Sequence, residues 1–497
     1  MKLYWGDLHN HCGISYGFGG LENALNAAKE QLDFCAVTGH AMWPDMPERS
    51  PETEFLIDFH EKGFAKLKKN WGSICRQIEA FNKDGEFITF HSYEIHSGEY
   101  GDHHIVSPDK ELQIKYLNSP KEIIQSLACR AIAIPHHIGY TPGYRGINWE
   151  SFDSGISPVI EVYSKHGCAM SETALYPYYH DMGPRDSRNC VYSGLKKGKK
   201  FSFVASTDHH AGYPGSYGDG RLAVLAEAKT RGNIWDAIVK GRTYAVTGDK
   251  IKCGFTVDGE VFGSTIQSGK RRNIELNIEG AYFIDKVIVY KNLRPIKTIC
   301  GESLTETNLE GRYKIRVEMG WGNQEKAYRW DCSVGVEHGS LAEVESCFRG
   351  KSVLAPKKEM AEDPNINLIN TRINKKNNAA VDWTCETFRN ISTLHPQTSS
   401  LILEVEGDMY TALSFDINGK QIKRTIKELL DNGMSDHMKP YSSEAFKIHT
   451  AVPQSKYCVG HSFVDKGPES ACDIYHLEVL QYNGQAAYVS PVYVESI

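Results

Sequence analysis

Two histidines near the start of the chain stand at the spacing that one metal ion needs. The residues Asp7-Leu8-His9-Asn10-His11 follow a short apolar run, Leu3-Tyr4-Trp5, which predicts a strand. Alternate side chains of a strand point the same way, so His9 and His11 present two imidazoles from one strand end. Fourteen of the 20 histidines lie in the first 210 residues. This concentration favours a shared cluster over isolated surface histidines.

Residue types that bind metals recur at the ends of further apolar segments. Six segments predict strands, at 2–7, 33–38, 86–91, 131–135, 158–163 and 201–206. The candidate ligands at or just after them are His9, His11, His40, Glu94, His103, His104, His136, His137, Glu161, Asp208, His209 and His210. The carboxyl ends of strands in barrels and open α/β sheets meet at one face, so we expect one polar cluster there.

The mixture of imidazole and carboxylate ligands indicates the chemistry. It suits Zn, Mn or Fe better than Mg or Ca. A carboxylate such as Glu94 could bridge two ions. Two closely spaced ions stabilise both the attacking and the leaving oxygen of a hydrolysis reaction, and they lower the pKa of a bound water. A lone histidine at a strand end is more often a surface residue, but the recurrence at successive strand ends weighs against that alternative.

Two other residues are candidates for contacting a substrate. Arg145 lies in a glycine-rich loop after a predicted strand, where its planar guanidinium could pair with an anionic group. An ordinary salt bridge is the equally weighted alternative. His166 follows the strand predicted at 158–163 and is a candidate general acid for a leaving group. A structural histidine is nearly as well supported there.

The first half of the chain alternates these strands with helices. Leu21 to Leu32 and Glu54 to Phe81 carry apolar residues at helical spacing. Ser119-Pro120-Lys121-Glu122 has the Ser cap, the Pro in the first turn and the Glu of a capping box. This alternation predicts a parallel sheet or barrel over residues 1–250.

The apolar period changes to two near residue 250. Residues 274–278, 287–290 and 313–317 alternate apolar with polar side chains. Asn483-Gly484 separates two further strand patterns, which is a strong hairpin signal. We therefore predict an antiparallel, sandwich-like β domain over 251–497, with an exposed insertion near 349–381.

Composition sets further limits. The chain has 497 residues, 41% hydrophobic and 24% charged, as in ordinary globular proteins, and a net charge of −6 gives no attraction to nucleic acid or acidic membranes. It lacks an apolar run long enough for a membrane span, and the early His pair leaves no room for a secretory signal. Thirteen cysteines without a C-x-x-C pair predict reduced, mostly buried thiols and a cytoplasmic protein.

In order along the chain, these motifs resemble those of the PHP (polymerase and histidinol phosphatase) superfamily. The matching positions are His9/His11, Thr38-Gly39-His40, Glu94 with His104, His136, and Asp208-x-His210. The segments Gly6-Asp7-Leu8-His9-Asn10-His11 and Arg242 to Gly248 resemble those of a PHP-like family of unknown function that carries a C-terminal β domain.

The resemblance implies a distorted (β/α)7 barrel with two or three divalent metal ions. One ion would be held by His9, His11, Glu94 and Asp208, a second by Glu94, His104 and His136, and a third by His40 and His210. Motif spacing favours His104 over His103 and His136 over His137. Two positions depart from the pattern, because Gly39 replaces the usual Asp and Ser15 to Phe18 stand where the third ion usually gains a histidine.

The motifs and the resemblance together favour a phosphoesterase that acts on a small anionic molecule, with His166 assisting the leaving group. A hydrolase of an amide, ester or sulfate-like bond is the first alternative, because the same metal-activated water serves any electrophilic centre. A non-catalytic, metal-stabilised binding protein is the second. No nucleic-acid or membrane partner is expected, and a homo-oligomer is left open.

Overall fold

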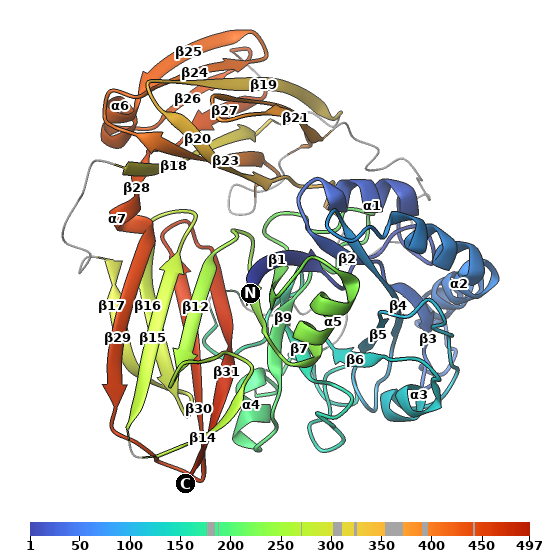
Figure 1. The fold of residues 1–497 in the computed structure, drawn as a ribbon. Helices are drawn as coiled ribbons and strands as arrows, with labels where there is room; N and C mark the ends of the chain where they lie inside the picture. The colour runs from blue at the N-terminus through green and yellow to red at the C-terminus, as the bar shows by residue number, and fades with distance from the viewer. Residues whose placement is uncertain are drawn as a thin grey trace.

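The six strands predicted in the first half are all present in the computed structural model (Figure 1). They are β1 (Lys2–Asp7), β2 (Phe34–Ala36), β4 (Ile88–Ile95), β6 (Ile132–Pro135), β7 (Val159–Ser164) and β9 (Ser202–Ala205). The structure describes residues 1–174, 176, 184–186, 188–269, 271–301, 311–322, 326–352, 371–389, 396–440 and 443–497. Between the predicted strands lie β3 (Gly39–Met42), β5 (His103–Ser107) and β8 (Gly167–Cys168), with β10 (Arg221–Ala226) and β11 (Thr243–Val246) after them.

The predicted helices also form. The long apolar stripe gives α2 (Glu54–Phe81), and the shorter one gives α1 (Leu21–Lys29), which ends earlier than predicted. In α3 (Pro120–Ser126) the Ser119 side chain accepts from the Glu122 backbone and the Glu122 side chain accepts from the Ser119 backbone, so the capping box is complete. α4 (Val191–Lys196) and α5 (Arg231–Val239) complete the helices described in this half.

Most strands of the first half belong to a mixed sheet. β1 pairs with β2, and β2 with β4, in parallel, whereas β4–β5 and β5–β6 are antiparallel, as are β1–β10 and β10–β11. β7, β8 and β9 form a separate three-stranded sheet. The mixed α/β character is confirmed, but a (β/α)7 barrel is not, because the described pairings are neither all parallel nor joined into one ring.

The second half is rich in β structure, as the two-residue period predicts. One sheet contains β12 (Lys252–Val257), β13 (Glu260–Val261), β15 (Arg272–Glu279) and β29 (Cys458–Asp465). A second contains β18 (Gly311–Gly320), β20 (Ser340–Cys347), β23 (Ser399–Gly407), β26 (Met434–His437), β27 (Ala445–Ile448) and β28 (Val452–Pro453). A third contains β19 (Tyr328–Glu337), β21 (Arg372–Lys376), β22 (Ala380–Thr387), β24 (Ala412–Ile417) and β25 (Lys420–Thr425). The short helices are α6 (Ile426–Asp431) and α7 (Gln454–Tyr457).

The second and third of these sheets share one hydrophobic core, which includes Trp330 and Trp383. They form the upper layer in Figure 1. Within the predicted insertion, residues 353–370 lie outside the described residues, and Arg372–Lys376 forms β21.

The largest sheet runs across both halves of the sequence. β14 (Thr265–Ser268), β16 (Ile284–Lys291), β17 (Arg294–Cys300), β30 (Cys472–Gln481) and β31 (Ala486–Ser496) join it through the pairing of β31 with β11. The predicted hairpin joins β30 to β31 at Asn483-Gly484. The boundary near residue 250 therefore stays a prediction, since hydrogen bonds of one sheet continue past it.

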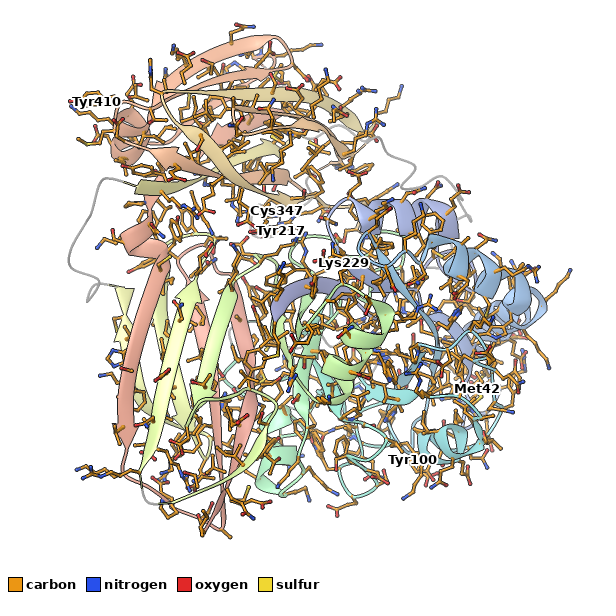
Figure 2. The ribbon with its side chains drawn as sticks, viewed as in Figure 1. Met42, Tyr100, Tyr217, Lys229, Cys347 and Tyr410 are labelled. Atoms are coloured by element: carbon orange, nitrogen blue, oxygen red, sulfur yellow. The ribbon has the colours of Figure 1, made fainter. Side chains whose placement is uncertain are left out.

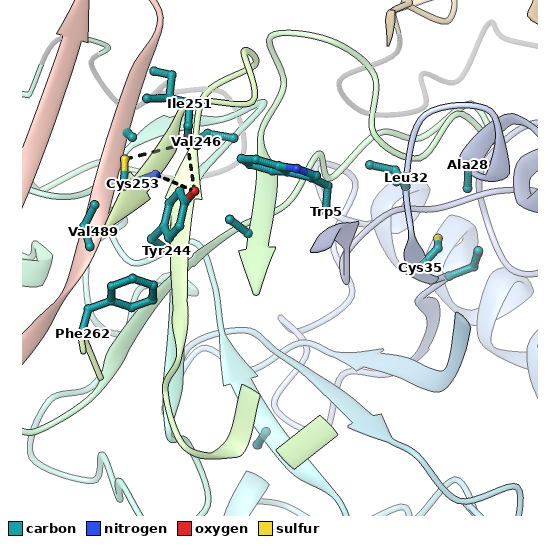
Figure 3. Packing of buried hydrophobic residues seen from close by; sticks show 14 of the residues in the cluster. Trp5, Ala28, Leu32, Cys35, Tyr244, Val246, Ile251, Cys253, Phe262 and Val489 are labelled. Atoms are coloured by element: carbon teal, nitrogen blue, oxygen red, sulfur yellow. Dashed lines mark hydrogen bonds between the residues drawn. The ribbon is translucent and has the colours of Figure 1, made fainter. Parts of the chain in front are cut away.

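Buried apolar side chains hold this junction together (Figure 3). The ring of Trp5 lies edge-on to Tyr244, with centroids 6.1 Å apart. The Tyr244 hydroxyl donates to the Ile251 carbonyl at 2.9 Å and accepts from the Cys253 amide at 3.1 Å. The chain end of β1, which carries the first His pair, is thus fixed against strands from both halves.

All thirteen cysteines are free thiols, and eight of them are buried, as predicted. No described helix is both long enough and apolar enough to span a membrane.

Candidate metal centre

Strand pairing brings the sequence-predicted ligands to one place. Within the sheet, Glu94 on β4 lies opposite His40 on β3 and opposite His104 on β5. His136 directly follows β6. The segment after β1 lies beside the segment after β9, where the His11 amide donates to the His209 carbonyl at 2.8 Å. This contact places Asp208 and His210 beside the first His pair.

The cluster is buried around the carboxylate of Glu94. Its Oε2 lies 3.1, 3.3 and 3.4 Å from the Nε2 atoms of His11, His40 and His9. Its Oε1 lies 3.2 Å from His136 Nε2. All eight predicted ligands are at most 4% exposed. Several nitrogen and oxygen donors thus converge on a space from which water is nearly excluded.

Asp208 forms the second carboxylate centre. Its Oδ1 lies 3.0 Å from His11 Nε2 and 3.5 Å from His9 Nε2. Its Oδ2 lies 2.9 Å from His166 Nε2 and 3.1 Å from His137 Nε2. The two centres are joined by His9 and His11, whose Nε2 atoms are 3.2 Å apart.

The outward nitrogen of several imidazoles is held by a neighbouring oxygen atom. Nδ1 of His9 lies 2.9 Å from Glu161, Nδ1 of His11 lies 2.5 Å from the Thr38 carbonyl, and Nδ1 of His40 lies 3.0 Å from the Ser15 hydroxyl. Where Nδ1 carries the proton of such a contact, the Nε2 lone pair of the neutral ring is left to face the cluster. Metal-binding histidines are typically oriented by such contacts.

These distances fit ligands that share an ion. Two donor atoms that are each about 2.1 Å from an ion lie roughly 3.0 Å apart at a right angle and roughly 3.4 Å apart at a tetrahedral angle. The four donor separations around Glu94, at 3.1–3.4 Å, fall in that range, and those around Asp208 lie in or within 0.1 Å of it, at 2.9–3.5 Å. Glu94 Oε2 and His104 Nε2 are also buried without a hydrogen-bond partner of suitable geometry among the described residues. Bound cations would satisfy both atoms.

Burial and the neighbouring charges shift the pKa of several members of the cluster. Burial raises the pKa of Glu94, but the nearby imidazoles of His40, His96 and His136 outweigh it and hold this pKa well below its usual value. Burial also raises the pKa of Asp208, but His9 and His166 outweigh burial and hold this pKa well below its usual value. Burial, with repulsion from neighbouring imidazoles, holds the pKa well below its usual value for His40, His104, His136 and His210. Ionised carboxylates and neutral imidazoles are the forms that bind metals.

His9 is the exception. Burial lowers its pKa, but Asp208 and Glu161 outweigh burial and raise it well above the usual value. A cation that binds His9 must therefore displace a proton.

The backbone is strained at three positions of this region. His137, Arg145 and Asp208 have φ values of 54°, 73° and 51°, in the left-handed region that non-glycine residues rarely adopt. Such conformations cost about 1–3 kcal/mol each and persist where the surroundings enforce them, often at functional sites.

Arg145 is engaged with Asp102. Its Nε lies 2.7 Å from Asp102 Oδ2 and its Nη2 lies 2.5 Å from the same oxygen. Nη2 also lies 2.8 Å from His96 Nδ1, and the side chain is only 10% exposed. Arg145 therefore forms the ordinary salt bridge that is the predicted alternative to a substrate contact. Its physical reason is that Asp102, fully buried, requires a cation.

Ser15 and Tyr16 belong to the segment that stands where the third ion usually gains a histidine. Ser15 Oγ contacts both the His40 side chain and its backbone amide at 3.0 Å. The Tyr16 ring stacks on His40 with centroids 3.5 Å apart, and its hydroxyl lies 2.7 Å from His96 Nε2. An expected histidine position is thus replaced by groups that orient His40.

Sequence reasoning missed part of this cluster. His96 and Asp102 lie inside it, with His96 Nδ1 3.2 Å from Glu94 Oε1. Both stand within a few residues of a predicted ligand, His96 two after Glu94 and Asp102 two before His104, and that spacing was the available signal. His103 instead directs Nδ1 to the Gly101 carbonyl at 2.8 Å, away from Glu94. His137 does reach the cluster, alongside His136.

Comparison with known proteins gives only distant similarities. No family model matches the chain. An uncharacterised protein of Chlamydia pneumoniae is 25% identical over 274 residues, which cover 50% of this chain and 43% of that protein. An uncharacterised protein of Chlamydia trachomatis is 24% identical over 297 residues, covering 55% and 44%. The chain spans less than half the length of these curated relatives.

Two solved structures are also similar. A two-domain protein of Bacteroides vulgatus, described as containing a predicted PHP-like metal-dependent phosphoesterase, matches with a TM-score of 0.32 at 12% identity, covering 85% of this chain and 94% of its own. The lesion-specific endonuclease EndoQ of Pyrococcus furiosus matches with a TM-score of 0.29 at 13% identity, covering 48% and 56%. At these identities and TM-scores, neither structure assigns a function to this chain.

Proposed function

We propose that this protein is a metal-dependent phosphoesterase of the PHP type, with two or three divalent ions of Mn, Zn or Fe. The observation that carries the proposal is the convergence of Nε2 atoms on Glu94 and Asp208, while Glu161, Thr38 and Ser15 hold the opposite ring nitrogens. Burying donor atoms that face one another in this way costs free energy unless cations bind between them.

The donor groups support an assignment of ligands to ions. His9, His11, Asp208 and Glu94 would hold the first ion. His104 and His136 with Glu94 would hold the second, and His40 and His210 the third. Three groups of donor atoms within 4.8 Å of one another bear on this assignment. His9/His11/Asp208 matches the first ion, whereas His9/His104/His136 and His11/His40/His210 bring together the histidines of the second and third ions with one histidine of the first.

When bound, such ions stabilise developing negative charge as Lewis acids and lower the pKa of water. The chain supplies orientation and proton transfer. Glu161 and the Thr38 carbonyl fix the tautomers of His9 and His11. His166, set between Asp208 Oδ2 at 2.9 Å and the Tyr140 hydroxyl at 3.3 Å, would donate the proton from Nε2 to the leaving oxygen.

The proposal is tested by elemental analysis of protein purified without chelators, followed by phosphate release from a panel of phosphoesters. His104→Gln and His103→Gln form a matched pair, because the two residues are adjacent on β5 and only His104 faces Glu94. We expect His104→Gln to lose bound metal and activity and His103→Gln to keep both. Fully metallated protein that cleaves no phosphoester would overturn the proposal.

Hydrolysis of an amide, ester or sulfate-like bond is the second candidate. It is favoured by the engagement of Arg145 with Asp102, which leaves this arginine committed to a carboxylate. Aromatic rings also line this side of the cluster, since Trp43 lies 5.3 Å from both His60 and the Arg145 guanidinium. The same metallated protein assayed on amide, ester and sulfate-ester panels would distinguish this candidate from the first.

The remaining parts of the proposal concern partners and location. We propose a small anionic substrate, no nucleic-acid or membrane partner, and a cytoplasmic location. A non-catalytic role would be supported by metallated protein that is inactive on all these panels yet unfolds when the metal is removed.

A further inference from the structure

A cavity of about 710 Å³ lies where distant parts of the chain meet, and its described lining contains none of the proposed metal ligands. It is lined by the loops after β7 and β9, by the β30–β31 hairpin, and by residues of β18 and β27. Figure 2 shows one lining residue, Tyr217, at the junction between the lower part of the molecule and the upper sheets. Both halves of the sequence therefore contribute to this junction cavity.

The described lining of the junction cavity holds more cationic than anionic side chains, although the chain as a whole carries a net charge of −6. Its described lining includes four cations, Lys165, Arg316, Arg349 and Lys447, but only two carboxylates, Asp219 and Glu318. Cations gathered in a concave, partly desolvated surface attract anions more strongly than the same groups on a convex surface.

Two of the cations are available to a ligand. The buried Nε of Arg349 has no hydrogen-bond partner among the described residues, and its guanidinium lies 5.0 Å from the centre of the Tyr217 ring. Lys447 is exposed on β27, with no ion pair to any residue that the structure describes. Arg316, by contrast, is engaged with Asp249 at 2.5 Å and with the Tyr217 hydroxyl at 3.0 Å.

The rest of the lining suits a ring that carries hydrogen-bonding groups. Five tyrosines contribute, Tyr163, Tyr176, Tyr217, Tyr282 and Tyr482, together with the amides of Asn483 and Gln485. Tyr482 is 62% exposed, so its ring faces open space. Tyrosine faces stack on planar rings, and amides pair with their edges. The volume falls within the range of sites for drug-sized molecules and far exceeds what an inorganic anion fills.

We propose that the junction cavity binds a small organic anion in which a phosphate is joined to a planar ring, as in a nucleoside monophosphate. Arg349 and Lys447 would bind the phosphate, and the tyrosines would bind the ring. The inference does not depend on the hydrolytic function proposed above. Ser164, Lys165 and Gly167 line the cavity on either side of His166, so an occupant would lie beside the segment that enters the metal centre.

The test is calorimetric titration of the full chain with the methylenephosphonate analogue of adenosine monophosphate, in which no ester can be cleaved. Inorganic phosphate and adenosine are titrated in parallel. Arg349→Gln and Lys447→Gln probe the cavity, Lys69→Gln on the exposed face of α2 is the matched charge control, and His9→Ala probes the metal centre. We expect saturable binding that weakens at least about tenfold in each cavity variant and stays unchanged in Lys69→Gln and His9→Ala.

The alternatives are distinguishable. The inference would be overturned if the analogue showed no saturable binding to the native chain. It would also be overturned if both cavity variants bound the analogue as tightly as the native chain does. If His9→Ala loses binding and the cavity variants keep it, the analogue binds at the metal centre. That result would overturn this inference without contradicting the proposed hydrolytic function. Inorganic phosphate or adenosine binding as tightly as the analogue would refute the combined recognition of anion and ring.

Discussion

Replacing Glu161 is expected to weaken metal binding without removing a proposed ligand. Its Oε2 lies 2.9 Å from His9 Nδ1, and both side chains are at most 2% exposed. In Glu161→Gln an amide oxygen can still accept the Nδ1 proton, so only the charge is lost. In Glu161→Ala the acceptor is lost as well, and the ring of His9 is no longer oriented.

The size of the effect follows from this contact. Loss of a group that orients a metal-binding histidine lowers metal affinity about 10- to 100-fold. We expect the lower end, about 1.4 kcal/mol, for Glu161→Gln and the upper end, about 2.7 kcal/mol, for Glu161→Ala. Burial lowers the pKa of His9, but Asp208 and Glu161 together raise it, so removing Glu161 also reduces competition from protons. The deficit should therefore be largest at alkaline pH and smaller at acidic pH.

Competition with a chromophoric chelator at several pH values measures these affinities. Glu404→Gln is the matched control, since Glu404 is buried on β23 and accepts a hydrogen bond from the Tyr457 hydroxyl at 2.9 Å, away from the metal centre. Native metal affinity in Glu161→Ala, or an equal loss in Glu404→Gln, would refute the role assigned to Glu161.

Three further predictions concern stability. Burial raises the pKa of Glu478 from 4.5 to about 7. Between these two pH values the folded chain binds more protons than the unfolded chain. The free energy of unfolding should therefore fall by up to about 3 kcal/mol as the pH rises from 4.5 through 7. Urea unfolding should show this slope in the native chain but not in Glu478→Gln. Arg145→Ala should cost about 3–5 kcal/mol by leaving Asp102 buried without its cation, and adding Asp102→Asn should recover part of it; additive losses would contradict this. Gly146→Ala should lower the melting temperature, because its Cβ would lie 1.8 Å from the Tyr140 carbonyl oxygen, and an unchanged value would contradict the close approach.

Local sequence signals predicted much of the secondary structure. The limits of α2, the capping box at Ser119 and the turn at Asn483-Gly484 depend on interactions between residues close in the chain. The strand ends that carry His9, Glu94 and His136 could likewise be located, because a run of buried apolar residues marks each strand. The candidate ligands then followed from residue type.

The pairing of strands could not be read in the same way. β5 was not predicted, and its antiparallel pairing with β4 is what places His104 rather than His103 opposite Glu94. The roles of Glu161 and Asp102 depend on partners 152 residues away in His9 and 43 residues away in Arg145. Separations of that size leave no periodic trace in a single sequence.

The amino-acid sequence by itself determined which residue types are available and on which local elements they stand, since hydrophobic period and capping are properties of neighbours in the chain. Only the tertiary structure decided which atoms face one another: that Asp208 meets His11 and that Arg145 is occupied by Asp102. The physical reason is that burial and strand pairing between distant segments set the distances between charges, and those distances decide both protonation and the capacity to hold a cation.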